Sequence, residues 1–276
     1  MAQRRGPQRF YKMTGSGNDF VVFDLSDGSA GEFENPEAIR LLAARGTGVG
    51  ADGVVFVERA DGGDVRMRYY NSDGSEADLC GNASLCSTNL AVELGMAQGG
   101  GFVLHTAAGS LRARIRDGLP EVDLDPVSEV RPDARDLGPK PGEVRLGYAR
   151  AGVPHVVVEV EDIESADVLG RGSELRRHPA LADGANVNFV ARRRDGTFTY
   201  RTFERGVEGE TLACGTGAVA TAIMLSSWGE SARETTFWTR SGLPLVVTLR
   251  REGPAWLPSL RGEGRIVFEG LLRDIG

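Results

Sequence analysis

The chain has 276 residues, of which 41% are hydrophobic and 26% are charged, and its formal net charge is −7 at pH 7. This composition is typical of a globular protein, and the acidic balance argues against the basic surface of a nucleic-acid-binding protein. No run of 18 apolar residues occurs, so a membrane-spanning helix is not expected.

The three cysteines are too few, and odd in number, for a disulfide framework, and they fit reduced thiols in a cytoplasmic protein. Residues 1–5 include two arginines, as a signal peptide can, but no apolar segment follows them. We therefore expect a short frayed N-terminus. Three scattered histidines offer no ligand spacing, and no metal site is predicted.

The first half of the chain alternates apolar runs with turn signals. Asn35 is a candidate N-cap before Pro36, and Gly46 is a candidate helix end. A second helix is expected to begin after Cys80 and to end at Gly95. Strands are expected at residues 20–23, 54–57, 65–70 and 111–115.

The second half repeats this order of elements. Residues 131–142 contain three prolines and two glycines and are predicted to form a linker. A helix is expected between Cys214 and Gly229. Strands are expected at residues 156–158, 189–191, 198–202 and 265–271.

The repeat has a constant spacing. Cys80 and Cys214 are 134 positions apart, and the same offset relates Asn71 to Arg205 and Gly50 to Gly184. Such self-similarity indicates a duplicated unit. We therefore predict an α+β fold of two pseudo-symmetric domains, each of mostly antiparallel sheet wrapped on central helices. The expected domains are residues 1–128 and 143–264, with the strand at 265–276 returning to the first, and the active site is expected in the inter-domain cleft.

Each repeat places a Cys-Gly pair just before a helix. After Cys80 the apolar positions Ala83, Cys86, Leu90 and Leu94 follow one helical face. A cysteine at a helix N-terminus is stabilised as thiolate by the free amides and the helix dipole. The amides of Gly81, Asn82, Gly215 and Thr216 can also bind a carboxylate.

Two such thiols could act as general base and general acid on one carbon and invert its configuration. Cys86 is expected to pack in the core instead. A redox pair formed by Cys80 and Cys214 stays open as an alternative, although no Cys-x-x-Cys motif is present.

The chain resembles diaminopimelate epimerases along nearly its whole length. The segments that carry the resemblance are KMTGSGNDF at 12–20, NSDGSE at 71–76, LCGN at 79–82, ERG at 204–206 and ETLACGTG at 210–217. Members of this family interconvert LL- and meso-diaminopimelate without pyridoxal phosphate or metal, on the route to lysine and peptidoglycan. The resemblance thus implies a cytoplasmic isomerase with a small amino-acid substrate, no cofactor, and no nucleic-acid or membrane partner. A homodimer is compatible with the sequence.

The resemblance also implies roles for individual residues. Cys80 and Cys214 would be the acid–base pair, assisted by His155 and Glu204. The substrate-binding residues would be Asn18, Asn71, Gly81, Asn82, Asn186, Arg205, Gly215 and Thr216, with Arg205 holding the distal carboxylate, which arginine can bind with two parallel hydrogen bonds.

Some positions depart from the family pattern. Many members have Gly-Asn-Pro-His where this chain has Val153 as the second residue, and Gly and Arg where it has Ala83 and Leu85. These changes put the recognition of the substrate in doubt more than the proton transfer.

Three rival functions remain. Proline or hydroxyproline racemases share the paired cysteines, but their first motif usually reads Cys-Gly-His, where this chain has Asn82. Isomerases of the phenazine type lack the cysteine pair. The third rival is a thiol- or ligand-binding relative without activity.

Overall fold

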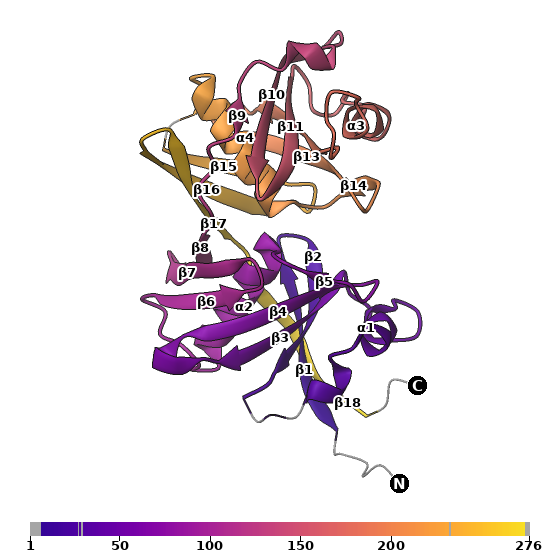
Figure 1. Ribbon diagram of the computed structural model, residues 1–276, viewed down its shortest axis with the longest axis vertical. Coiled ribbons are helices and arrows are strands. Elements are labelled where there is room, and N and C mark those ends of the chain that lie inside the picture. The colour runs from indigo at the N-terminus through magenta and orange to yellow at the C-terminus, as the bar shows by residue number, and fades with distance from the viewer. Residues whose placement is uncertain (1–6, 27, 29, 232, 274–276) are drawn as a thin grey trace. The chain divides into compact units, whose positions relative to one another are not determined.

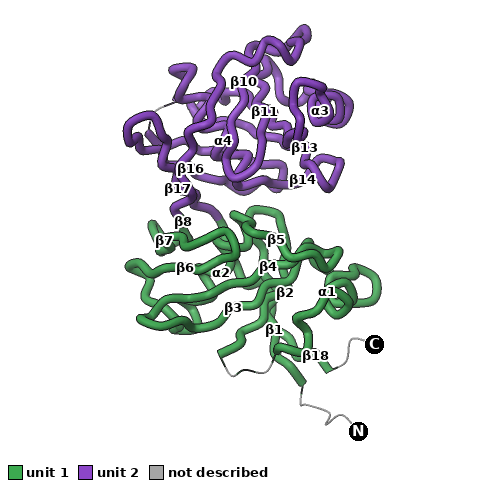
Figure 2. The backbone as a smooth tube through the Cα atoms, viewed as in Figure 1, with its two compact units in different colours: residues 1–122, 263–276 green, residues 123–262 purple. Residues whose placement is uncertain are grey.

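The computed structural model describes residues 7–26, 28, 30–231 and 233–273 (Figure 1). Residues 1–6, which include the expected frayed end, lie outside this description. The chain divides into two compact units, residues 1–122 with 263–276, and residues 123–262 (Figure 2). Among the described residues, no helix combines the length and apolar character needed to cross a membrane.

Unit 1 is built on one twisted sheet with two α-helices. Its helices are α1 (Pro36–Ala43) and α2 (Gly81–Glu93), with short 3-10 turns at Ala30–Phe33 and Asp61–Gly63. Its strands are β1 (Gln8–Gly15), β2 (Asn18–Asp24), β3 (Gly53–Arg59), β4 (Val65–Asn71), β5 (Glu76–Ala77), β6 (Phe102–Thr106), β7 (Gly109–Arg116), β8 (Leu119–Asp123) and β18 (Arg265–Leu272).

Unit 2 repeats this plan. Its helices are α3 (Val168–Arg176) and α4 (Gly215–Ser227), with a 3-10 turn at Arg135–Leu137. Its strands are β9 (Val130–Arg131), β10 (Glu143–Ala151), β11 (Val153–Val160), β12 (Asn186–Arg192), β13 (Phe198–Glu204), β14 (Gly209–Thr211), β15 (Glu234–Trp238), β16 (Pro244–Glu252) and β17 (Ala255–Gly262).

The pairing order is the same in both units. In unit 1 the order β1-β2-β3-β4-β6-β7 is antiparallel except at β2–β3 and β4–β6. In unit 2 the order β10-β11-β12-β13-β15-β16 is antiparallel except at β11–β12 and β13–β15. At the chain end, β18 pairs antiparallel with β1. The predicted α+β fold with duplicated, mostly antiparallel sheets is confirmed.

One helix in each unit is enclosed by its sheet. Strands β1, β2, β3, β4, β7 and β18 all contact α2, and β10, β11, β12, β16 and β17 contact α4. The other helix packs on the opposite side of the sheet, where α1 covers an apolar cluster that includes Phe23 and Phe56. Helix α3 covers the matching cluster around Val158 and Phe189.

Helix α2 is more deeply buried than its sequence pattern predicts. Ser84, Ser87 and Thr88 are fully buried together with the apolar positions. The hydroxyls of Ser84 and Thr88 donate to carbonyls four residues earlier, Cys80 O at 2.9 Å and Ser84 O at 2.7 Å. Because the helix backbone accepts these two bonds, Ser84 and Thr88 can lie inside the unit, whereas Ser87 Oγ is buried without a partner among the described residues. The expected single apolar face was wrong.

Three helix boundaries were predicted correctly, but one helix end and one segment were not. The Asn35 side chain accepts from Ala38 N at 3.0 Å and begins α1, and Gly95 and Gly229 follow α2 and α4 in the left-handed conformation. Helix α1 ends at Ala43, earlier than the expected Gly46. Residues 131–142 are no bare linker, because Ala134 and Leu137 bury their side chains in the core of unit 2.

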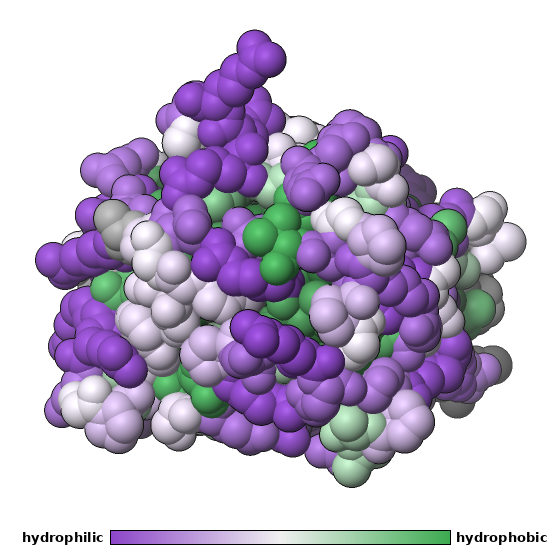
Figure 3. Space-filling view, turned by 90° about the horizontal axis from the view of Figure 1, so that it is seen from above, coloured by the Kyte–Doolittle hydropathy of each residue, from purple (hydrophilic) through white to green (hydrophobic). Residues whose placement is uncertain are grey.

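Polar residues dominate the face of the molecule seen in Figure 3. The face drawn in Figure 3 shows apolar residues only in small patches among polar ones. Three of the exposed large apolar residues, Val267, Phe268 and Leu271, lie on β18.

Candidate active site

Cys80 and Cys214 occupy equivalent positions, each at the N-cap of an enclosed helix. Their backbones are nearly identical, with φ −131° and ψ 117° at Cys80 and φ −134° and ψ 112° at Cys214. Neither side chain forms a capping hydrogen bond to its helix. Each sulfur therefore lies at the positive end of a helix dipole without being used to cap it, which favours the thiolate form.

Cys86 lies in a different environment from these two thiols. It is fully buried in α2, and burial raises the pKa of its thiol, with smaller contributions from Cys80 and Glu263. It therefore stays protonated, as expected for a residue that packs in the core.

In unit 1, hydrogen bonds fix the orientation of two asparagine side chains. Asn18 Nδ2 donates to Asp52 Oδ2 at 3.1 Å, so Asn18 Oδ1 faces the other way and accepts from Asn82 Nδ2. Asn82 is 2% exposed, and its Oδ1 has no hydrogen-bond partner among the described residues. This oriented acceptor, buried without a partner in the described part of the chain, comes two residues after Cys80 in the sequence, and such an atom indicates a missing donor from a ligand or an ordered water.

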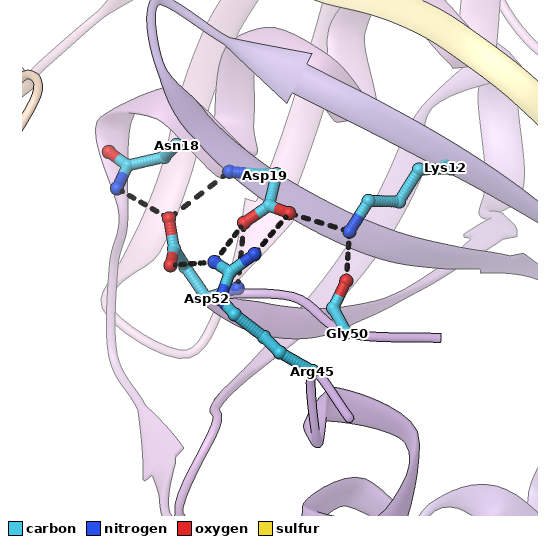
Figure 4. Close-up of polar contacts among 6 residues, drawn as sticks. All are labelled: Lys12, Asn18, Asp19, Arg45, Gly50 and Asp52. Atoms are coloured by element: carbon cyan, nitrogen blue, oxygen red, sulfur yellow. Dashed lines mark hydrogen bonds and ion pairs between the residues drawn. The ribbon is translucent and has the colours of Figure 1, made fainter. Parts of the chain in front are cut away.

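A cluster of charges holds Asn18 and Asp52 in place (Figure 4). Asp19 accepts from Lys12 Nζ at 2.7 Å and from both terminal nitrogens of Arg45, at 2.7 and 3.1 Å. Arg45 also pairs with Asp52 at 2.7 Å. Burial alone would raise the pKa of Asp19, but the hydrogen bonds and charges of Arg45 and Lys12 outweigh it and lower the pKa to about 2.

This cluster leads to a prediction about stability and pH. Because the folded-state pKa of Asp19 lies below its unfolded value, its contribution is complete above about pH 4 and is lost as the pH falls towards 2. We expect Asp19→Asn to lower the free energy of unfolding by about 2 kcal/mol at neutral pH. The difference between wild type and Asp19→Asn should shrink between pH 4 and pH 2, measured by denaturant unfolding.

Asp117→Asn is a matched control, because Asp117 is exposed and asparagine accepts its positive φ of 52°. This variant should stay close to wild type at every pH. A constant difference between wild type and Asp19→Asn over the same pH range would contradict the stated role of Asp19.

Asn71 is engaged in a turn instead. Its Oδ1 accepts from the Tyr69 hydroxyl at 3.1 Å, and its Nδ2 donates to Ser75 Oγ at 3.0 Å. These bonds brace the connection between β4 and β5, so part of its hydrogen-bonding capacity is used structurally.

In unit 2, Cys214 joins a buried polar network. Cys214 Sγ lies 3.6 Å from Thr216 Oγ1, and Thr216 Oγ1 lies 3.1 Å from His155 Nε2. His155 is fully buried, and burial, with a smaller effect from the Arg205 charge, lowers its pKa to about 3. The imidazole is therefore neutral at physiological pH.

Sequence reasoning missed the other members of this network. Asn188 Nδ2 lies 3.2 Å from His155 Nδ1, and Asn188 Oδ1 accepts from the hydroxyls of Tyr200 and Thr202 at 2.9 and 3.1 Å. Tyr200 also approaches Cys214 O at 3.1 Å. The available signal was an asparagine between the apolar residues Val187 and Phe189 of a buried strand, since such a residue needs partners inside the fold.

Glu204 is the last residue of β13, Arg205 follows it, and Asn186 begins the neighbouring strand β12. Asn186 Oδ1 accepts from Arg205 N at 2.8 Å, and Arg205 Nη1 donates to Asp183 O at 2.8 Å, which leaves other guanidinium donors for a ligand. Glu204 accepts from the Thr211 hydroxyl. Asn186 is the register partner of His155 across β11 and β12, and Val187 pairs with Phe203 on β13, so these residues lie at the same end of the three strands.

Two further features bear on the chemistry. Within the described part of the chain, no cluster of three histidine, cysteine or acidic residues could hold a metal ion. A surface cavity of about 400 Å³ lies in unit 2, but its lining includes none of the predicted site residues. The cavity is lined by residues such as Arg131, Tyr148 and Arg150. We therefore base the functional assignment on the network around Cys214 and not on this cavity.

Comparison with known sequences identifies relatives along the whole chain. The profile of the family described as diaminopimelate epimerase matches residues 10–130 and 147–266. A diaminopimelate epimerase of Gemmatimonas aurantiaca is 50% identical over 271 residues, which cover 95% of this chain and 98% of the relative. That of Aquifex aeolicus is 37% identical, covering 96% and 98%.

Solved structures with the same fold are more distant in sequence. A Bacillus anthracis phenazine biosynthesis protein of the PhzF family has a TM-score of 0.72 at 15% identity, covering 97% of this chain and 99% of that one. A hydroxyproline epimerase of Agrobacterium vitis has a TM-score of 0.64 at 20% identity, covering 99% and 94%. At these identities the likeness establishes the fold alone.

Proposed function

Because the chain belongs to the diaminopimelate epimerase family, we propose that it converts LL-2,6-diaminopimelate to meso-diaminopimelate by moving one α-proton with Cys80 and Cys214. The reaction is an isomerisation in the synthesis of lysine and of peptidoglycan precursors. The observation that carries the assignment of roles is the repeated Cys-Gly-helix junction, with the same backbone conformation in both units.

The proposed chemistry is a two-base proton transfer. One cysteine is a thiolate and takes the α-proton, which leaves the electron pair on carbon. The other cysteine is a thiol and gives its proton to the opposite face of that carbon. The first sulfur ends protonated and the second as thiolate, so the overall charge is unchanged and the configuration is inverted.

Helix N-termini supply the electrostatic stabilisation in this proposal. The amides of Gly81, Asn82, Gly215 and Thr216 begin α2 and α4, and they would bind the carboxylate next to the reacting carbon. Charge that develops towards this carboxylate in the transition state is stabilised by the same donors. In this proposal Asn82 Oδ1, which has no partner among the described residues, would accept from the α-ammonium group.

The distal end of the substrate needs separate recognition. Arg205 would pair with the distal carboxylate through the guanidinium donors that Asp183 O does not use. Asn186, held against the Arg205 backbone, and the oriented Asn18 would contribute further polar contacts, with Asn71. His155 is proposed to assist as a neutral group, and Glu204 from the end of β13.

A substrate panel tests the assignment. The reduced protein is incubated in D₂O with LL-diaminopimelate, L-proline or trans-4-hydroxy-L-proline at equal concentration, and α-deuteration and stereoisomer content are followed. We expect conversion of LL-diaminopimelate to the meso form and at least about 10²-fold lower kcat/KM for the other two, because neither has a distal carboxylate to pair with Arg205. Preferential turnover of proline or hydroxyproline would overturn the diaminopimelate assignment.

A further inference from the structure

We infer that a directional chain of hydrogen bonds begins at Asn188 and ends with the Thr216 hydroxyl donating to Cys214 Sγ. Asn188 is thereby a positioning residue and Thr216 a donor to the reacting sulfur. The consequence rests on the proposed function, in which Cys214 exchanges the α-proton. Each step follows from a contact within unit 2.

The orientation of the Asn188 amide is fixed by a carbonyl. One side of the amide lies 3.0 Å from Val156 O, which can only accept, so this side must be the NH₂ group. The other side faces the hydroxyls of Tyr200 and Thr202. Burial raises the pKa of Tyr200 well above its usual value, so this phenol keeps its proton and can donate.

The Asn188 NH₂ group then fixes the tautomer of His155. It lies 3.2 Å from His155 Nδ1, and two N–H groups cannot share one hydrogen bond, so Nδ1 must be the acceptor. A neutral imidazole with an unprotonated Nδ1 carries its proton on Nε2. His155 Nε2 therefore donates to Thr216 Oγ1, which is 3.1 Å away.

The Thr216 hydroxyl proton is then directed at sulfur. Thr216 Oγ1 accepts from His155, so the Thr216 hydroxyl proton can be donated to a second atom. Among the described residues that atom is Cys214 Sγ, which lies 3.6 Å from Thr216 Oγ1. A hydrogen bond to the charged form of a group lowers its pKa, so this donor favours the Cys214 thiolate. Asn188 acts on the sulfur only through the intervening histidine and threonine.

The packing leaves little freedom for another arrangement. Asn188 and His155 are fully buried, and a methyl group at Gly217 would collide with Asn188 Oδ1 and the Tyr200 hydroxyl. The backbone of α4 thus approaches the amide closely and holds its plane in place, while the contact with Val156 O decides which end of the amide is NH₂.

Other ionisable or charged groups also face Cys214 and His155. Tyr200 on β13 interacts with Cys214 and also with Glu204, and Arg205, just after β13, interacts with His155. These groups and the N-terminus of α4 are the same in all variants compared. A change in the pKa of Cys214 when Thr216 is replaced therefore measures the effect of the Thr216 hydroxyl.

The first test measures the pKa of Cys214 in the substrate-free, full-length protein. The rate of alkylation of Cys214 by iodoacetamide is followed against pH, with the modified peptide quantified by mass spectrometry. Thr216→Val, which removes the hydroxyl but keeps the shape, should raise the apparent pKa by about one unit. Thr216→Ser should restore most of the wild-type value.

Thr221→Val is the matched control. Thr221 lies on the same helix, is fully buried and donates to Gly217 O at 2.7 Å. Its replacement therefore perturbs α4 without changing any residue of the proposed hydrogen-bond chain. It should leave the pKa of Cys214 unchanged. An unchanged pKa in Thr216→Val, or an equal rise in Thr221→Val, would overturn the inference.

The second test reads the tautomer directly. Nitrogen-15 NMR of His155, identified by its loss in His155→Gln, should show a proton on Nε2 in wild type. A proton on Nδ1 would overturn the inference, because His155 Nδ1 could then not accept from the Asn188 NH₂ group. Both readouts are made without substrate, so they stand or fall independently of whether diaminopimelate is turned over.

Discussion

Alanine at position 80 or 214 is expected to lower kcat for LL-to-meso conversion by at least about 10³-fold, because each variant loses either the group that takes the proton or the group that returns it. The two losses should be of similar size, since inversion needs both steps. The measurement is the initial rate at saturating LL-diaminopimelate, with circular dichroism to show that each variant is folded.

Cys86→Ala is the matched control for these variants. Cys86 is a fully buried thiol on the same helix as the Cys80 junction, and its pKa is raised by burial. Its replacement should cost some stability and leave kcat within about twofold, as is usual for a small core change. A Cys80→Ala or Cys214→Ala variant that keeps more than a tenth of wild-type kcat would contradict the proposed roles.

Replacing Arg205 with lysine is expected to lower kcat/KM for LL-diaminopimelate by about 10²-fold, the value of one to two hydrogen bonds to a charged group. Lysine keeps the charge but cannot pair with a carboxylate through two parallel N–H groups. The Arg205 backbone N–H, which donates to Asn186 at 2.8 Å, is unaffected by the change.

Arg177→Lys provides the comparison for Arg205→Lys. Arg177 is an exposed arginine of the same unit that pairs with Glu208 at 2.6 Å, and its replacement should leave kcat/KM unchanged. If Arg205→Lys retained wild-type kcat/KM, the distal carboxylate would have to be held by other groups. Val153 stands where many family members have asparagine, and its side chain cannot hydrogen-bond. The Arg205→Lys comparison therefore measures how much of the recognition of the distal carboxylate depends on Arg205.

Local signals in the sequence carried much of the fold. Asn35 and Pro36 begin α1, and glycines follow both enclosed helices, because caps and left-handed turns depend on a few neighbouring residues. The repeated Cys-Gly junction was also local, and the structure gives both cysteines the same conformation. The family and the epimerase activity that it implied are confirmed by the relatives.

Contacts between residues far apart in sequence were not predictable in the same way. Asp19 pairs with Arg45 across 26 positions, and Asn188 meets His155 across 33. The members of each pair lie on different elements, so the periodicity of a single helix or strand cannot predict their contact. The burial of Ala134 and Leu137 within residues 131–142 was missed for the same reason, since both pack on side chains that come later in the sequence.

The distribution of solvent deuterium tests the two-thiol account most directly. LL-diaminopimelate is incubated with wild-type protein in D₂O to low conversion, and deuterium at the α-carbons is measured separately in the meso product and in the remaining LL substrate. The account predicts one deuterium in the product, at the inverted carbon, and none in the remaining substrate, because one group removes the proton and a different, solvent-exchanged group replaces it. Deuterium accumulating in unconverted LL-diaminopimelate as fast as in the meso form would contradict it, because that result requires a single group to exchange the proton on one face.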